Sequence, residues 1–519
     1  MSTRTPVRAG VALLAACVGL GLSTVPATAQ TQLPDGPALA RNLVKKVTVS
    51  GINRHLIAFQ RLADRNGGNR AAGTPGYDAS VQYVAGLLRN AGYDVSTPEF
   101  TYPVQVYDAK TATVGSTSVE AIPMEESPQT PVGGVTGKLV TTADAPGDAT
   151  PGCEASDFAG KDFTGAIALI RRGSCTFESK AKNAHAAGAV GVLIANNTAG
   201  PLTNVTVTDG VVPTGGISQA DGTALFALEG QTATVDMRFH IEERPSVNII
   251  AETKTGRKNN VVMAGAHLDS TETGAGINDN GTGSAALLET ALQMGGSPKV
   301  NNAVRFAWWG AEELGLIGST KYVQSLTFEQ QLDIALYLNF DMIGSPNAAY
   351  FVYDGDDSDG EGAGEGPYGS AQIEAAFVDF LETTGTPTEG TDFSGRSDYG
   401  EFIAQGIPAG GLFTGAEGVK TEAQAAKWGG VAGQAYDPCY HTRCDNLGNV
   451  DRVAMDRNAD AMAWVTASYG ISTEDINGVP PKNAKQAKAA TDTRAAMRLA
   501  VIKSEAHNHD GGHSHAAVK

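Results

Sequence analysis

The sequence VVMAGAHLDSTETGAGINDNGTGSAALLE occupies residues 261–289 and begins with an apolar run, Val261–Ala264. Such a run predicts a buried strand. The strand would present His267 and Asp269 at its carboxyl end, where open α/β sheets bind their ligands. Asp279 follows twelve residues after His267, in a loop flanked by glycines. Three candidate metal ligands are therefore expected near one strand end.

A second apolar strand is predicted at the start of VRFAWWGAEELGLIGS, residues 304–319, and the adjacent carboxylates Glu312 and Glu313 follow it. An imidazole with several convergent carboxylates is a ligand set that suits zinc. A carboxylate beyond the ligands is suited to proton transfer. A single His or Asp after a strand is more often a cap or a solvated loop residue, but this grouping at two strand ends favours a metal site.

The chain resembles the secreted two-zinc aminopeptidases of the M28 family, from streptomycetes and their relatives, in six segments: GAHLDS, GINDNGTGS, WWGAEELGLIGS, NFDMIGS, GRSD and CYHTRCD. The resemblance covers most of residues 43–475 and is interrupted by an insert. It implies a hydrolase that removes N-terminal residues from peptides. Strands alternate with helices over residues 261–470, which predicts an α/β fold, a three-layer α/β/α sandwich with a mostly parallel central sheet.

The resemblance also implies a ligand set for two zinc ions. One ion would take His267 and Asp341, and the other would take Glu313 and His441. Asp279 would bridge both ions. Each zinc would then keep an open position for water and substrate, as a catalytic site requires.

Three further residues receive roles by resemblance. Asp269 would orient His267, because a ligating histidine usually needs a partner on its other ring nitrogen. Glu312 would take a proton from the attacking water and pass it to the leaving amine. Tyr440, which precedes the ligand His441, would donate a hydrogen bond to the oxyanion of the tetrahedral intermediate.

The same resemblance predicts how a substrate would bind. Glu312, Asp341 and the main chain near Arg396 are candidates to hold the free α-ammonium group. Met342 and Phe413 match positions that line an apolar pocket for the first side chain. Leucine-like residues should therefore be preferred.

Calcium is a weaker expectation. The family's calcium site matches Asp456 and Asp460, but Lys46 stands where a third, N-terminal aspartate would be. An acidic insertion at residues 354–366 could also bind calcium, yet Tyr368 stands where a calcium loop would need its final glutamate. We therefore interpret the insertion as a solvated surface loop.

Residues 126–245 are predicted to form a separate, β-rich insert. They include two strand-like runs, Gly165–Ile170 and Val190–Ala195. The segment from Cys153 to Ala189 resembles the protease-associated domain, which is thought to gate or extend substrate access in secreted peptidases. Cys175 and His185 could be interpreted as a catalytic pair, but their helix-like context favours a structural role.

In chain order, the expected segments are a signal peptide (1–29), a loosely held leader (30–46), the first part of the peptidase domain (47–125), the insert (126–245), the catalytic part (246–475) and a disordered tail (476–519). The tail is rich in Ala and Lys and then in His. Its last four histidines form a composition that can chelate zinc weakly; they are His507, His509, His513 and His515.

The first 29 residues have the features of a secretory signal. Arg4 and Arg8 precede an apolar stretch at residues 10–22, which is too short to cross a bilayer, and an Ala-x-Ala cleavage site lies at residues 27–29. These features predict that the protein is secreted. The alternative is a lipoprotein anchored at Cys17, because residues 14–17 resemble a lipoprotein cleavage box.

Cysteine usage agrees with export. Beyond the signal, the chain has four cysteines, an even number as an oxidised framework requires. We expect Cys153 to pair with Cys175 and Cys439 to pair with Cys444. A structural zinc site is disfavoured because no CxxC motif is present.

Composition limits the remaining function classes. The 519 residues carry a formal net charge of −18, which argues against nucleic acid as a partner. Peptides are the expected partners, and we expect a monomeric chain with no membrane span. The alternatives are a catalytically altered binding protein, or a carboxypeptidase or glutaminyl cyclase on the same scaffold. A carboxypeptidase should show an arginine patch for the terminal carboxylate, and we locate none.

Overall fold

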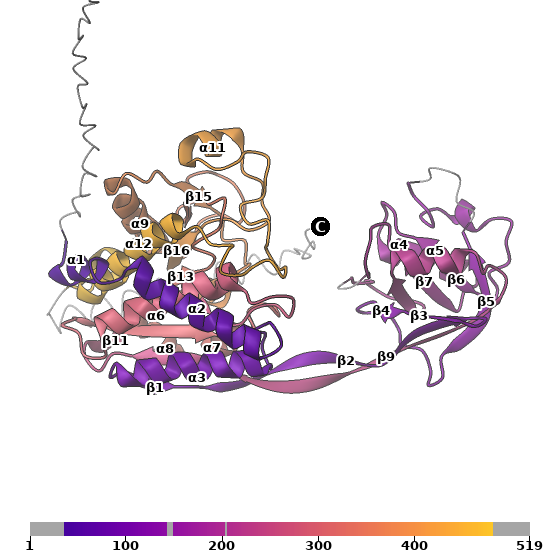
Figure 1. Cartoon of the computed structure of the whole chain (residues 1–519), viewed down its shortest axis with the longest axis horizontal. Helices are drawn as coiled ribbons and strands as arrows, with labels where there is room; N and C mark the ends of the chain where they lie inside the picture. The colour runs from indigo at the N-terminus through magenta and orange to yellow at the C-terminus, as the bar shows by residue number, and fades with distance from the viewer. Residues whose placement is uncertain (1–35, 143–148, 203–204, 481–519) are drawn as a thin grey trace, which may run out of the picture. The chain divides into compact units, whose positions relative to one another are not determined.

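The computed structural model describes residues 36–142, 149–202 and 205–480. These residues form two compact units, labelled by element in Figure 1. The first unit contains the described residues up to Thr97 and from Asn248 onward, and the second is Pro98–Val247.

The first unit is built on an eight-stranded sheet of order β1-β10-β12-β11-β13-β16-β14-β15. Its central strands β12, β11, β13 and β16 run parallel, whereas β1, β10 and β14 join antiparallel neighbours. The prediction of a mostly parallel central sheet is confirmed. The strands are β1 (Asp94–Ser96), β10 (Ile249–Glu252), β11 (Arg257–His267), β12 (Asn302–Trp309), β13 (Ile334–Phe340), β14 (Phe351–Tyr353), β15 (Glu389–Thr391) and β16 (Ala409–Phe413).

Adjacent tryptophans at the end of β12 show that helices cover both faces of this sheet. Successive side chains of a strand point to opposite faces. The indole N–H of Trp308 donates to the carbonyl of Ser284 in α6 (Gly283–Met294) at 3.2 Å. Trp309 packs instead with Val323 of α7 (Ile317–Ser325) and Phe402 of α10 (Gly400–Ala404). The predicted three-layer sandwich is therefore present, and its central strands are apolar because both faces are buried.

Helix α12 lies in the same layer as α6 and contacts β11 and β12. The carboxylate of Asp451 accepts the backbone N–H groups of Val453 and Ala454, which fixes where the helix begins. The helices of this unit are α1 (Ala38–Val44), α2 (Val49–Arg65), α3 (Pro75–Asn90), α6 (Gly283–Met294), α7 (Ile317–Ser325), α8 (Phe328–Leu332), α9 (Ser370–Thr383), α10 (Gly400–Ala404), α11 (Glu422–Trp428), α12 (Arg452–Ile471) and α13 (Glu474–Asn477).

The second unit has its own eight-stranded sheet, of order β3-β2-β9-β5-β6-β7-β8-β4, and two apolar cores. The two predicted strand-like runs correspond to β6 and β7. Its elements are β2 (Glu99–Val114), β3 (Thr117–Glu120), β4 (Ile122–Pro123), β5 (Val135–Thr141), a 3₁₀ turn (Ala155–Phe158), β6 (Ile167–Arg171), α4 (Phe177–Ala186), β7 (Gly191–Ala195), β8 (Thr214–Ile217), α5 (Gln219–Phe226) and β9 (Thr232–Val247). Cys153 is bonded to Cys175, with a Cα–Cα distance of 5.9 Å.

This unit begins earlier than the sequence predicted. We expected the insert to start at residue 126, but the structure starts the unit at Pro98. The physical reason is the pairing of β2 with β9, whose antiparallel register runs from Glu99 opposite Val247 to Val114 opposite Ala233. A strand that contributes this ladder belongs to the same folding unit as its partner.

Residues 38–44 also correct the prediction of a loosely held leader at residues 30–46. They form α1, which contacts α12, and Ala40, Leu43 and Val44 are buried. These apolar residues lie at helical spacing, so one face of a short helix can pack against the core. The start of the predicted disordered tail is likewise ordered, because Ile476 of α13 is buried.

Several predictions from the sequence lie outside the described residues. They are the signal peptide at residues 1–29, the alternative anchor Cys17 and the four tail histidines. Among the residues that are described, no helix is both long and apolar enough to cross a membrane.

Replacing Leu43 by Ala should destabilise the protein if α1 belongs to the folded core. Leu43 is 2% exposed, and truncating a buried leucine typically costs about 2–5 kcal/mol. Chemical denaturation should show this loss, and Asn42→Ala, at an exposed position of the same helix, is the matched control. Equal stability of the two variants would show that residues 38–44 are not part of the core.

Candidate active site

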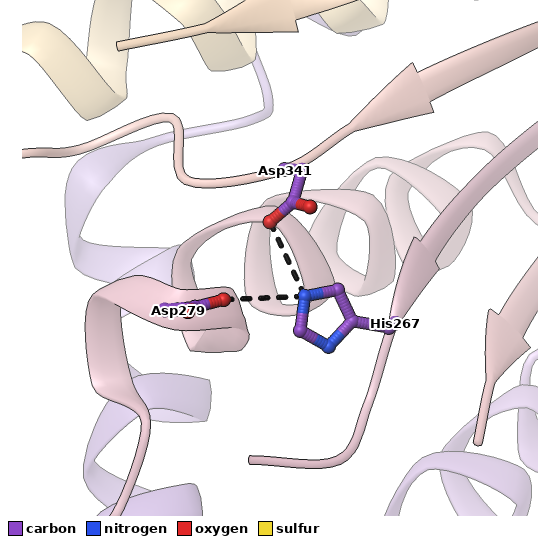
Figure 2. A group of neighbouring side chains, drawn as sticks. All are labelled: His267, Asp279 and Asp341. Carbon is purple, nitrogen blue, oxygen red and sulfur yellow. Dashed lines mark hydrogen bonds and ion pairs between the residues drawn. The ribbon is translucent and has the colours of Figure 1, made fainter. Parts of the chain in front are cut away.

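The first group of candidate ligands lies where β11 and β13 end. His267 closes β11, and Asp341 follows β13. Because these strands are parallel neighbours, their carboxyl ends meet at one edge of the sheet. His267 Nε2 lies 3.2 Å from Asp341 Oδ1 and 3.2 Å from Asp279 Oδ1, and Figure 2 shows both carboxylates directed at the imidazole ring.

A second group shares Asp279 with the first. His441 Nε2 lies 3.2 Å from Asp279 Oδ2 and 2.9 Å from Glu313 Oε2. Asp279 therefore faces the two histidines with different oxygens of one carboxylate. In each group, the candidate donor atoms lie within 4.8 Å of one another. All five predicted ligands are brought together.

The electrostatics of both groups favour positive charge. Burial opposes protonation of His267, but the surrounding carboxylates, Asp341 foremost, raise its pKa well above the usual value. Burial likewise opposes charge on His441, yet Asp279 and Glu313 raise its pKa to about 10. The two points at which carboxylates converge on a ring nitrogen are thus places where a cation is stabilised.

The donor set fits metal ions. Glu313 Oε1 is buried and accepts no hydrogen bond, although a buried acceptor normally has a partner. Two imidazole nitrogens and three carboxylates are ligands that zinc accepts in catalytic sites. The residues present could therefore hold one ion at each group, with Asp279 between them.

Glu312 is placed differently from its neighbour Glu313. It lines a small cavity of about 80 Å³ at the site, and its Oε2 lies 3.8 Å from His267 Nε2. Burial raises the pKa of Glu312 well above its usual range; His267 opposes this shift, and Asp341 adds to it. The residues predicted to bind the substrate line the same cavity, namely Asp341, Met342, Arg396 and Phe413, and so does the predicted oxyanion donor Tyr440.

The ring of Tyr440 stacks on that of His441, with centroids 3.8 Å apart. Burial, and then the charge of Asp279, raise the pKa of the Tyr440 hydroxyl above its usual value, and Arg396 opposes the shift. Tyr440 is therefore a neutral hydrogen-bond donor at the cavity.

Tyr440 and His441 lie in a loop that is closed by the predicted disulfide between Cys439 and Cys444. The Cα–Cα distance of this disulfide is 5.2 Å. The next residue, Asp445, accepts the backbone N–H groups of Asn278 at 2.7 Å and Asp279 at 3.0 Å. Asp445 thus ties the disulfide loop to the shared carboxylate. Sequence reasoning missed it, although it stands inside the quoted segment CYHTRCD.

Asp269 contacts both His267 and the residues that follow β12. His267 Nδ1 lies 3.2 Å from the main-chain carbonyl oxygen of Asp269 and 3.6 Å from its carboxylate. The carboxylate also accepts the backbone N–H groups of Glu312 at 3.3 Å and Glu313 at 3.4 Å. Asp269 therefore positions both strand ends.

Ser397 was not predicted, although it belongs to the quoted segment GRSD. Its hydroxyl donates to Asp341 Oδ2 at 2.7 Å and accepts from the side-chain amide of Asn339 at 2.9 Å. This leaves Asp341 Oδ1 to face His267. Only the tertiary fold brings residues 341 and 397 together, so spacing alone gave no signal.

Arg70 lies in a glycine-rich loop at residues 67–77 and gives that loop a structural role. Its guanidinium is fully buried and donates to the carbonyls of Leu268, Ala275 at 2.9 Å and Gly276 at 2.6 Å. These carbonyls lie on the loop that joins His267 to Asp279. Burial lowers the pKa of Arg70 to about 10, so it remains a cation beside the acidic site.

Other acidic groups lie apart from these two clusters. Asp354, Asp356 and Glu374 approach one another, and Asp354 is buried and accepts backbone N–H groups of the loop that follows. The insertion at 354–366 is therefore anchored at its start, and most of its later residues are exposed, as a surface loop requires. Among the described residues, none of the groups with metal-ligand spacing includes Asp456 or Asp460.

The comparisons with known proteins agree with this geometry. Residues 248–466 match the model of peptidase family M28, and residues 135–225 match that of the PA domain. The chain is 47% identical over 457 residues to a probable lipoprotein aminopeptidase of Mycobacterium tuberculosis, covering 86% of this chain and 90% of that one. It is 41% identical over 426 residues to leucine aminopeptidase 2 of Arthroderma otae, covering 80% and 83%.

Among solved structures, it resembles a zinc aminopeptidase from Bacillus subtilis. The TM-score is 0.60 with 25% identity, covering 85% of this chain and 97% of that one.

Removal of the Cys439–Cys444 disulfide should disturb the second ligand group, because that loop carries His441. In a Cys439→Ser, Cys444→Ser variant we expect zinc affinity at one site to fall by about 10- to 100-fold, as when residues that orient a ligand are lost. Calorimetric titration of zinc measures this. The Cys153→Ser, Cys175→Ser variant, in the other unit, is the control. Unchanged affinity at both sites would contradict the role of the loop.

Proposed function

The chain belongs to peptidase family M28 and is a metallo-aminopeptidase with an inserted PA domain, and on this basis we propose that it removes leucine-like residues from peptide N-termini with two zinc ions. The observation that carries the proposal is Asp279, whose two carboxylate oxygens face His267 and His441 separately. A carboxylate shared in this way suits a site for two ions rather than one.

In this proposal, His267 and Asp341 would hold one ion, Glu313 and His441 would hold the other, and Asp279 would offer an oxygen to each. The buried, unpartnered oxygen of Glu313 supports its assignment as a ligand. Bound there, zinc would polarise the scissile carbonyl and lower the pKa of water at the site.

Glu312 supplies proton transfer. Its carboxylate lines the cavity but belongs to neither ligand group, so it is available to the reacting atoms. It takes the proton of the attacking water and delivers it to the nitrogen of the leaving amine. Tyr440, at the same cavity, donates its hydroxyl hydrogen to the oxyanion that forms at the scissile carbonyl.

The charged and apolar groups that line the cavity determine which substrate N-termini bind. The carboxylates of Glu312 and Asp341 and the main chain near Arg396 receive the substrate's α-ammonium group. Met342 and Phe413 provide the apolar wall for the first side chain. The similarity to a protein named leucine aminopeptidase 2 supports a preference for leucine.

We also propose that the enzyme acts outside the cytoplasm. Two disulfides in the described residues and the signal-like residues 1–29 support export. The similarity to a probable lipoprotein supports one alternative, lipid attachment at Cys17. Mass spectrometry of the mature N-terminus separates a chain that begins at Gln30 from one that begins at a lipidated Cys17.

Chelation should abolish hydrolysis of leucine p-nitroanilide, and zinc should restore it, because every proposed step requires the metal site. Restoration should be complete near two zinc ions per chain, measured by elemental analysis beside the rate. Full activity with one zinc per chain would contradict the two-ion proposal, and hydrolysis from the carboxyl end of a peptide would contradict the aminopeptidase assignment.

Glu312→Gln and Glu313→Gln should both reduce activity, but for different reasons, although the residues are adjacent. Glutamine at 312 keeps the shape of the side chain but cannot carry a proton, so turnover should fall by ~10² to 10⁴ while zinc content persists. Glutamine at 313 replaces a charged ligand, so zinc should be lost and excess zinc should partly restore activity.

The comparison requires zinc content and turnover of both purified variants. Loss of metal from the 312 variant, with both ions kept in the 313 variant, would show that the two roles are reversed.

A further inference from the structure

We propose that Glu417 is a positioning residue that acts through Arg396 on Tyr440, and that this chain of contacts directs the Tyr440 hydroxyl hydrogen toward the reacting carbonyl. The inference deepens the proposed function and rests on it, because it assumes that Tyr440 stabilises the oxyanion. In this proposal the Arg396 side chain orients Tyr440, whereas the main chain near Arg396 binds the α-ammonium group of the substrate.

The three side chains form a continuous series of hydrogen bonds. Arg396 Nη1 donates to Glu417 Oε1 at 2.9 Å, and its Nη2 donates to Glu417 Oε2 at 3.4 Å. The same Nη2 also donates to the Tyr440 hydroxyl oxygen at 3.2 Å. Arg396 and Tyr440 line the cavity of the active site, whereas Glu417 is not among the lining residues. Glu417 therefore reaches the cavity through its hydrogen bonds to Arg396.

The chemistry of these groups sets the direction of each bond. A guanidinium group has donors and no acceptor, so the Tyr440 oxygen must be the acceptor in its bond with Arg396. The hydroxyl hydrogen must then point to a different acceptor. Stacking on His441 fixes the plane of the Tyr440 ring, with 24° between the two rings. Because Tyr440 lines the cavity, we assign this hydrogen to the cavity side, where an oxyanion would form.

The ion pair between Arg396 and Glu417 is too exposed to contribute much to the stability of the fold. The side chains of Arg396 and Glu417 are 59% and 55% exposed. Ion pairs with this exposure contribute little to folding, because water screens them and two long side chains lose rotamer freedom. A flexible, exposed arginine would spend little time beside Tyr440 unless a partner held it. The two oxygens of Glu417 match the fork of the guanidinium and provide that hold.

The test is a double-mutant cycle in the zinc-loaded full chain. Glu417→Ala should lower kcat by about two- to tenfold, toward the lower end of the coupling measured between contacting residues, and should change KM little. Glu417→Gln keeps one acceptor oxygen and should recover part of the loss. In a Tyr440→Phe background, which removes the hydroxyl, Glu417→Ala should have no further effect on kcat.

The control is Glu422→Gln, an exposed glutamate in the first turn of α11, which should leave kcat, KM and the melting temperature unchanged. The melting temperature and zinc content should also be unchanged in the Glu417 variants, which separates positioning from a structural role.

Three results would overturn the proposal. Glu417→Ala could leave kcat unchanged, could act mainly on KM, or could reduce kcat equally in the Tyr440→Phe background. Each would show that Glu417 does not act through the hydroxyl. A wild-type protein without aminopeptidase activity would overturn the proposed function as well, so the two failures are distinguishable.

Discussion

The site depends on the placement of one carboxylate, that of Asp279, between two histidines that come from distant parts of the chain. His267 closes a central strand and His441 lies in a disulfide-closed loop, and each ring nitrogen is 3.2 Å from a different oxygen of Asp279. Such an arrangement concentrates negative charge in a buried place, which is unfavourable without compensating cations. The surrounding protein is built to tolerate this charge and to fix its geometry.

Three side chains outside the ligand groups provide that geometry. Arg70 binds the carbonyls of the loop between His267 and Asp279, and it supplies a buried positive charge. Asp445 holds the backbone of Asp279 itself, and Ser397 holds the second oxygen of Asp341. Each contact joins segments that are far apart in sequence, so the site can assemble only when the whole first unit is folded. The parallel strands β11 and β13 place their ends at one edge, and these hydrogen bonds then orient the ligands.

Much of this could be predicted from the sequence. Apolar runs located β11 and β12, and the resemblance to the M28 family named the five residues that the structure brings together. The remaining features depend on tertiary contacts that leave no local pattern. The partners of Arg70 are main-chain carbonyls, which have no sequence signature. The early start of the second unit depends on pairing between β2 and β9, more than a hundred residues apart. The sequence of residues 38–44 does not by itself indicate a core helix, because so short an amphipathic helix is stabilised only by the surface it packs on.

The central claim is that Asp279 bridges two metal ions. The measurement that tests it most directly is X-ray diffraction from crystals of the zinc-loaded protein, collected on both sides of the zinc absorption edge. The account predicts two anomalous peaks, one beside His267 and Asp341 and the other beside Glu313 and His441, with one oxygen of Asp279 on each. A single peak, or two peaks of which only one contacts Asp279, would contradict it.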